Sequence, residues 1–149
     1  MKKLILFTLV LSIFSCQQTT IVNTTLETEY INPASGYSQV VSVTANGIKT
    51  LYISGQIGEG EDLESQMRSA LTNLEEQLTA GGATYKDIVK MNTYIVDYKP
   101  EDLATFRDTR KDIMGDANMP ASTLVGVTAL ALPEWIIEIE AVAVIKVQE

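Results

Sequence analysis

The sequence contains no histidine and only one cysteine, Cys16, among its 149 residues. Without histidine, the side chain that most often serves as a general base or a metal ligand is missing. A single cysteine cannot form an internal disulfide, and it cannot supply a cysteine-cluster zinc site. Any catalysis must therefore use carboxylates, hydroxyls, lysine, arginine or backbone dipoles, and we expect no metal and no other cofactor.

Positive charge is also scarce. The chain has 11 lysines and arginines against 19 acidic residues, a net charge of −8 and an isoelectric point of about 4.5. The three arginines, Arg68, Arg107 and Arg110, form no basic stripe. A nucleic-acid-binding surface needs clustered positive charge to release counterions, so we expect no nucleic-acid partner. A chain of this length is expected to form one domain with its own core.

The first sixteen residues, MKKLILFTLVLSIFSC, contain two lysines, an apolar run and a small residue before Cys16. The run is shorter than the roughly 20 residues of a membrane-spanning helix, and this order is that of a secretory signal. The cysteine is typical of a bacterial lipoprotein; a plain signal peptide with a chance cysteine is the alternative. We predict a lipoprotein signal peptide over 1–15, lipid on Cys16, a polar tether over 16–32, and an exported, membrane-anchored lipoprotein of the cell envelope.

The rest of the sequence predicts strands and helices in the order β-β-α-β-α-β-β. Asn46-Gly47 is typical of a type I′ turn between the two strands of a hairpin. An apolar stripe of helical period predicts a first helix that ends at Gly81-Gly82, and Gly115 ends the second. Three further strands are expected at 87–97, 122–132 and 136–147.

The apolar patterns also predict how the sheet is covered. Two helices are enough for one face of a sheet of this size. The last two predicted strands are apolar on both faces, and the sequence offers no third helix for the second face. Another subunit is the simplest cover. We therefore expect an α+β fold with both helices on one face of a mixed sheet, and a homo-oligomer with its sites between subunits.

The last predicted strand contains two glutamates in an apolar pattern. With a period of two, Glu138 and Glu140 share one face. A carboxylate in such a strand must be hydrogen-bonded, paired, hydrated or protonated. In a pocket, Glu138 could position water or move a proton; on an exposed rim, both glutamates would simply be solvated. The pattern by itself leaves both interpretations open.

Three further positions lie at the ends of predicted strands. Ser54-Gly55 ends one strand, where the missing side chain allows a ligand to approach the backbone. Tyr37 and Ser122 each begin a strand. Taken singly, these are ordinary features of strand ends and packed aromatic residues. No catalytic triad can be built on Ser122, because no histidine exists to activate its hydroxyl.

Taken together, the segments SGYSQVV, LYISGQIG, DIVKMNTYIVD, FRDTR, MPAST and IEIEAVAV resemble the RidA/YjgF family of imine and enamine deaminases. The resemblance runs from about Pro33 to Val147. It implies a chorismate-mutase-like domain over 33–149, a homotrimer, and ligand clefts between subunits. It also implies that Glu138 is the catalytic acid that orients the hydrolytic water. The implied ligand contacts are Tyr37, Ser54, Gly55, and the backbone N–H of Leu124.

Two positions depart from the family pattern. In active members, the residue after Pro-Ala is an arginine that clamps the substrate carboxylate, and here that residue is Ser122. Family members often have an asparagine in the second helix at the position of Arg107 in this chain. Arg107 is either a replacement cation in the cleft or an ordinary solvated arginine. The resemblance thus leaves two functions open. The first is an imine deaminase, a hydrolase whose activity is weak or whose substrate is altered. The second is a non-catalytic, small-molecule-binding envelope lipoprotein of the same fold.

Overall fold

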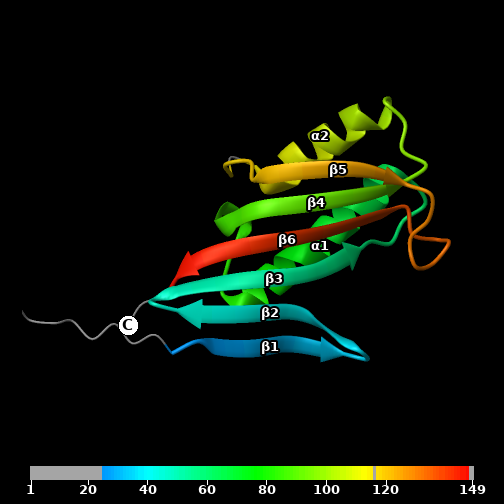
Figure 1. Cartoon of the computed structure of the whole chain (residues 1–149). Coiled ribbons are helices and arrows are strands. Elements are labelled where there is room, and N and C mark those ends of the chain that lie inside the picture. The colour runs from blue at the N-terminus through cyan, green and yellow to red at the C-terminus, as the bar shows by residue number, and fades with distance from the viewer. Residues whose placement is uncertain (1–24, 116, 148–149) are drawn as a thin grey trace, which may run out of the picture.

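The computed structural model describes residues 25–115 and 117–147, which form a six-stranded sheet with two helices on one face (Figure 1). In sheet order, the strands are β1 (Glu27–Ala34), β2 (Tyr37–Ala45), β3 (Ile48–Ile57), β6 (Ile137–Lys146), β4 (Ile88–Val96) and β5 (Ala121–Val127). Only β4 and β5 pair in parallel; the other neighbours are antiparallel. The predicted α+β fold with a mixed sheet is confirmed.

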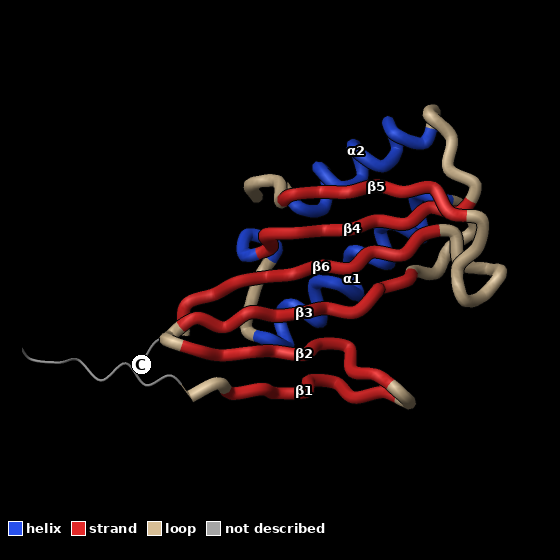
Figure 2. The backbone as a smooth tube through the Cα atoms, in the orientation of Figure 1, coloured by secondary structure: helices blue, strands red, loops and turns tan. Residues whose placement is uncertain are grey.

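The two helices are α1 (Leu63–Gly81) and α2 (Asp102–Met114), and a short 3-10 helix, η1 (Tyr85–Asp87), precedes β4. Figure 2 shows both helices behind the sheet, with α1 crossing its centre and α2 lying near β5. The apolar stripe of α1 faces the sheet and is fully buried at Met67, Ala70, Leu71, Leu74 and Leu78. Each buried leucine stabilises the fold by about 1.5–3 kcal/mol, so this stripe holds the helix on the sheet.

The first strand of the sheet was not predicted. Strand β1 pairs with β2 from Glu27 opposite Thr44 to Ala34 opposite Tyr37. The predicted tether over 16–32 and the predicted domain start at residue 33 are therefore wrong for residues 27–32. An edge strand tolerates polar residues because main-chain hydrogen bonds hold it in place, so composition did not distinguish it from a tether. The predicted signal peptide and Cys16 lie outside the described residues.

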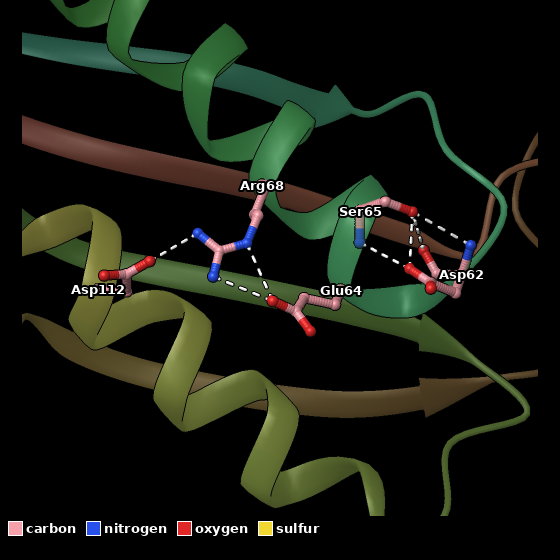
Figure 3. Close-up of polar contacts among 5 residues, drawn as sticks. All are labelled: Asp62, Glu64, Ser65, Arg68 and Asp112. Carbon is pink, nitrogen blue, oxygen red and sulfur yellow. Dashed lines mark hydrogen bonds and ion pairs between the residues drawn. The ribbon is translucent and has the colours of Figure 1, made fainter.

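The hairpin turn and the helix ends follow their predicted chemistry. Asn46 and Gly47 both have positive φ, 51° and 72°, as a type I′ turn requires. Gly82 after α1 and Gly115 after α2 are also left-handed in φ, at 85° and 57°. At the other end of α1, Ser65 N–H donates to Asp62 Oδ1 at 2.8 Å and Asp62 N–H donates to Ser65 Oγ at 3.2 Å (Figure 3).

Strand β5 is shorter than predicted. It ends at Val127, and residues 128–136 form a loop instead of continuing the strand to residue 132. The reason lies in its neighbour: among the described strands, β5 pairs only with β4, and β4 ends at Val96, opposite Val127. Without a partner, further backbone groups of β5 would gain no ladder hydrogen bonds. The prediction placed the apolar residues of 128–132 on the two faces of the sheet. This is wrong, because these residues lie in the loop after β5.

The face of the sheet away from the helices, called here the open face, carries a group of apolar side chains. It carries exposed Tyr30, Tyr52 and Val125, and partly buried Val142 and Val144. Cross-strand pairs connect them, since Tyr52 lies opposite both Val41 and Val142. An exposed apolar face of this kind marks an interaction surface.

Within the described residues, no helix has the length and hydropathy to cross a bilayer.

Candidate functional site

Glu138 lies on the open face with its side chain folded against the backbone of Gly55. A Cβ atom on residue 55 would overlap Glu138 Oε1 and would lie 2.7 Å from Cγ. The β3–β6 register shifts between Ile53 and Gln56, so Ser54 and Gly55 form a bulge beside the carboxylate, a feature common next to active sites. The structure therefore brings together three of the predicted residues, Ser54, Gly55 and Glu138.

The surroundings of Glu138 favour its protonated form. The side chain is half-buried, and burial, followed by the negative charge of Glu140, raises the pKa of Glu138 above its ordinary value. Glu140 itself is held by two neighbours on β4: Asn92 Nδ2 donates to Oε1 at 2.6 Å, and Tyr94 OH donates to the same oxygen at 3.1 Å. A carboxyl group with a raised pKa keeps its proton to a higher pH than an ordinary glutamate does, and it can act as a proton donor or acceptor.

A cavity of about 200 Å³ lies on the open face beside these carboxylates. Its lining is mixed: Lys90, Asn92 and Glu140 are polar, and the other lining residues are Tyr52, Ile53, Ala141 and Val142. Glu138 is not part of the lining. Lys90 Nζ donates to Thr123 Oγ1 at 2.6 Å, which ties the cavity wall to β5. No cluster of three metal-ligating side chains occurs among the residues that the structure describes.

Tyr37 lies at the same end of the sheet as Ser54. It is the exposed first residue of β2. The next residue, Ser38, accepts a hydrogen bond of 2.7 Å at its carbonyl oxygen from Ser54 Oγ. Because this bond occupies the Ser54 hydroxyl proton, Ser54 meets a ligand as an acceptor or through its backbone.

Ser122 and Leu124 form a second group on the other side of the sheet. Ser122 of β5 lies opposite the buried Met91 of β4 and so faces α2. Arg110 Nη1 of α2 donates to Ser122 Oγ at 3.1 Å. Leu124 is partly buried and packs against the core. Arg107, one turn before Arg110 on α2, is exposed. The arginine that contacts Ser122 is therefore Arg110, which the motif comparison had not singled out.

Within one protomer, the two groups do not meet. Glu138 pairs with Tyr94, and Tyr94 pairs with Val125. Ser122 is three residues earlier on β5, about 10 Å along the strand, and on the opposite face. A ligand contacting both Glu138 and Ser122 would therefore have to lie between two copies of the chain.

Sequence reasoning missed Arg110, Asn92 and Tyr94. A signal for the last two was present, because polar Lys90, Asn92 and Tyr94 alternate with residues that face the core. Arg110 follows Arg107 by three positions and so lies on a neighbouring part of the same helix face. Which of the two arginines reaches β5 depends on the rotation of α2 over the sheet, and helical period does not specify that rotation.

Comparisons with known proteins agree with this fold. A family model described as Endoribonuclease L-PSP matches residues 27–145. A 2-iminobutanoate/2-iminopropanoate deaminase from Dermatophagoides farinae is 31% identical over 134 residues, covering 85% of this chain and 96% of that protein. The deaminase of the same name from Bos taurus is 34% identical over 116 residues, covering 72% and 79% of the two chains.

Solved structures show the same architecture. A Rid-family protein, YyfB, from Yersinia pestis is 36% identical, with a TM-score of 0.62, over 78% of this chain and 97% of that one. A YjgF-family protein from Neisseria meningitidis, 23% identical, shares the fold with a TM-score of 0.68 over 83% and 97% of the two chains. The sheet and its one-sided helices thus define a small α+β domain of the YjgF/Rid fold. The chain belongs to the RidA/YjgF family, whose family model is described as Endoribonuclease L-PSP.

Proposed function

We propose that the protein hydrolyses short 2-imino acids, the tautomers of enamines, and releases ammonia. The observation that carries this proposal is the contact between Glu138 and Gly55, which places a half-buried acid against the bulge of β3. The names of the relatives from Dermatophagoides farinae and Bos taurus, 2-iminobutanoate/2-iminopropanoate deaminases, support the reaction class.

The proposed chemistry is an addition of water to a C=N bond. Glu138, when ionised, accepts a hydrogen bond from water and removes its proton as the oxygen attacks the imine carbon. The protonated carboxyl then returns this proton to the nitrogen, which gives a carbinolamine. Glu138 next moves the proton of the new C–OH group to the nitrogen, the C–N bond breaks, and ammonia leaves as the C=O bond of the 2-keto acid forms. The raised pKa of Glu138 suits these steps, because an acid that titrates closer to neutral pH exchanges protons in either direction.

We place this site between protomers of a homotrimer, the assembly that the family resemblance implies. Two features of the single chain support the placement. The open face exposes Tyr30, Tyr52 and Val125, which a second copy would cover. Ser122 also lies on the opposite face of the sheet from Glu138, so only a neighbouring copy could bring the two to one ligand.

The contact with the substrate carboxylate differs from the family pattern. A guanidinium held by two charge-assisted hydrogen bonds contributes a few kcal/mol, whereas a single neutral hydroxyl contributes about 1 kcal/mol net. Ser122 alone would hold a carboxylate weakly. This favours the prediction of weak or altered deaminase activity, and it is also the observation behind the alternative of a binding protein without catalysis. The net charge of −8 favours a small-molecule substrate over RNA.

The deaminase proposal is tested with purified full-length protein and 2-iminopropanoate generated in situ by an amino-acid dehydratase. We expect the protein to shorten the lifetime of the imine and to speed the release of pyruvate and ammonia in proportion to its concentration. The matched measurement uses heat-denatured protein at the same concentration. Binding of pyruvate without any shortening of the imine lifetime would instead favour the non-catalytic alternative.

For the N-terminal segment, which lies outside the described residues, we propose export and lipid attachment at Cys16. The order of lysines, apolar run, small residue and cysteine supports this. We expect radiolabelled palmitate to enter the wild-type protein in a bacterial host and not the Cys16→Ala variant, which should lose membrane association. Equal labelling of the two proteins would contradict a lipid on Cys16 and leave a plain signal peptide.

A further inference from the structure

Arg110 occupies an unusual position for a surface arginine. Its guanidinium carbon lies 4.8 Å from the centroid of the Phe106 ring, and its Nη1 donates to Ser122 Oγ at 3.1 Å. Phe106 is buried in the core, so the guanidinium is held between a ring of α2 and a hydroxyl of β5. Burial, and then the charge of Arg107, lower the pKa of Arg110, although a guanidinium stays protonated at any ordinary pH.

The charge of Arg110 is not neutralised by the part of the chain that the structure describes. Arg68 provides the contrast: it bonds Glu64 at 3.0 Å and Asp112 at 2.7 Å (Figure 3). The described ion pairs include neither Arg110 nor Arg107. Arg107 and Arg110 lie three residues apart on α2, so two positive charges lie close together on this helix. A partly desolvated cation of this kind favours an anion beside it.

Two further donors lie on β5, the strand that Arg110 contacts. Ser122 Oγ accepts the hydrogen bond of Arg110, which leaves its own O–H free to donate. Strand β5 is the edge of the sheet. The Val127 carbonyl oxygen accepts from Asp97 N–H at 2.9 Å, so the backbone groups of Val127 point to the β4 side. Along a strand, the N–H and C=O groups of successive residues point alternately to the two sides. Ser122 and Leu124 therefore direct their N–H groups to the free edge.

We propose that Arg110, the Ser122 hydroxyl and the Leu124 N–H form an oxyanion-binding site at the free edge of β5. The inference rests on the proposed function in one respect: the anion it takes is the carboxylate of a 2-imino acid. Arg110 then supplies, from a helix, the positive charge that Ser122 lacks. Its fork of donors can bind one carboxylate oxygen while Ser122 binds the other. The neighbouring Arg107 adds positive charge without touching Ser122.

The test compares two arginines that differ in their partners. Arg110→Gln should raise KM for 2-iminopropanoate at least about tenfold and change kcat less than threefold, because the lost contact holds the carboxylate and not the reacting carbon. The same variant should weaken binding of pyruvate, measured by calorimetry, by a similar factor. The control Arg68→Gln removes an arginine of the same charge, already paired with carboxylates, and should leave KM and pyruvate binding within twofold of wild type.

The outcomes separate this site from the deaminase proposal. Binding of pyruvate that depends on Arg110, in a protein that does not shorten the imine lifetime, would support the anion site and overturn the proposed function. Normal deaminase activity with unchanged KM in Arg110→Gln would overturn the anion site alone. If Arg110→Gln fails to fold, Arg110→Lys keeps a cation near Phe106. It should still raise KM severalfold, because an ammonium lacks the planar fork, and unchanged KM would overturn the site.

Discussion

Replacing Glu138 with glutamine is expected to lower kcat/KM for 2-iminopropanoate by at least about 10²-fold. Glutamine keeps the shape of the side chain and can still fold against Gly55, but it cannot accept a proton from water. General acid–base groups contribute about 10²–10⁴-fold to such reactions, so this is the largest effect that we expect from a single substitution. The measurement is the lifetime of imine generated in situ, compared at equal concentrations of folded wild-type and variant protein.

The same substitution is expected to stabilise the fold at neutral pH. Burial and Glu140 raise the pKa of Glu138 in the folded state above its unfolded value. The stability contributed by the protonated carboxyl is therefore complete below the unfolded pKa, and it is lost as the pH rises through the folded pKa. Glutamine stays neutral throughout, so Glu138→Gln should melt higher than wild type at pH 7 and equally at pH 3.5. Solvent screening limits the gain to below about 1 kcal/mol.

The matched control is Glu134→Gln, which removes the same charge from an exposed position in the loop before β6. It should change both activity and melting temperature little, because surface substitutions usually stay within about 0.5 kcal/mol. Undiminished activity in Glu138→Gln, beside an active wild type, would remove Glu138 from the mechanism. A lower melting temperature for Glu138→Gln at pH 7 would contradict the raised pKa.

Gly55→Ala is expected to have the second largest effect. The added methyl group would overlap Glu138 Oε1, and the carboxylate would have to swing away from the bulge. A misplacement of about 1 Å in an active site can cost 10²-fold in rate, so we expect kcat/KM to fall by about 10–10²-fold. The end of a flexible side chain moves easily, and φ of Gly55 is not positive. The free energy of unfolding, measured by urea titration, should therefore change by less than about 1 kcal/mol.

A double-mutant cycle shows whether Gly55→Ala acts through Glu138. In the Glu138→Gln background, the proton acceptor is already lost, so adding Gly55→Ala should lower activity by less than about threefold. Additive losses in the double variant would mean that residue 55 contributes independently, for example by contacting the ligand through its backbone. A large loss of stability in Gly55→Ala would point to a damaged sheet instead of a displaced carboxylate.

Much of the fold was accessible from local patterns. The period of α1 identified the residues that cover the sheet, and Asn46-Gly47 identified the hairpin. The alternation in β6 correctly put Glu138 on the face opposite the core residue Ile139. These inferences succeeded because helix and strand periods depend on neighbours a few residues away. Strand β1 was missed, and β5 was extended too far, because both depend on whether a distant strand is there to pair.

The sequence by itself determined which side chains face the core, that an acid lies in an apolar strand, and that the motif arginine is replaced by Ser122. Only the tertiary structure decided that Glu138 rests on Gly55, that Ser122 lies on the opposite face, and that Arg110 reaches it. Those facts depend on strand register, on the bulge in β3 and on the rotation of α2 over the sheet. Register and rotation are set by packing between segments far apart in the chain, which no local period encodes.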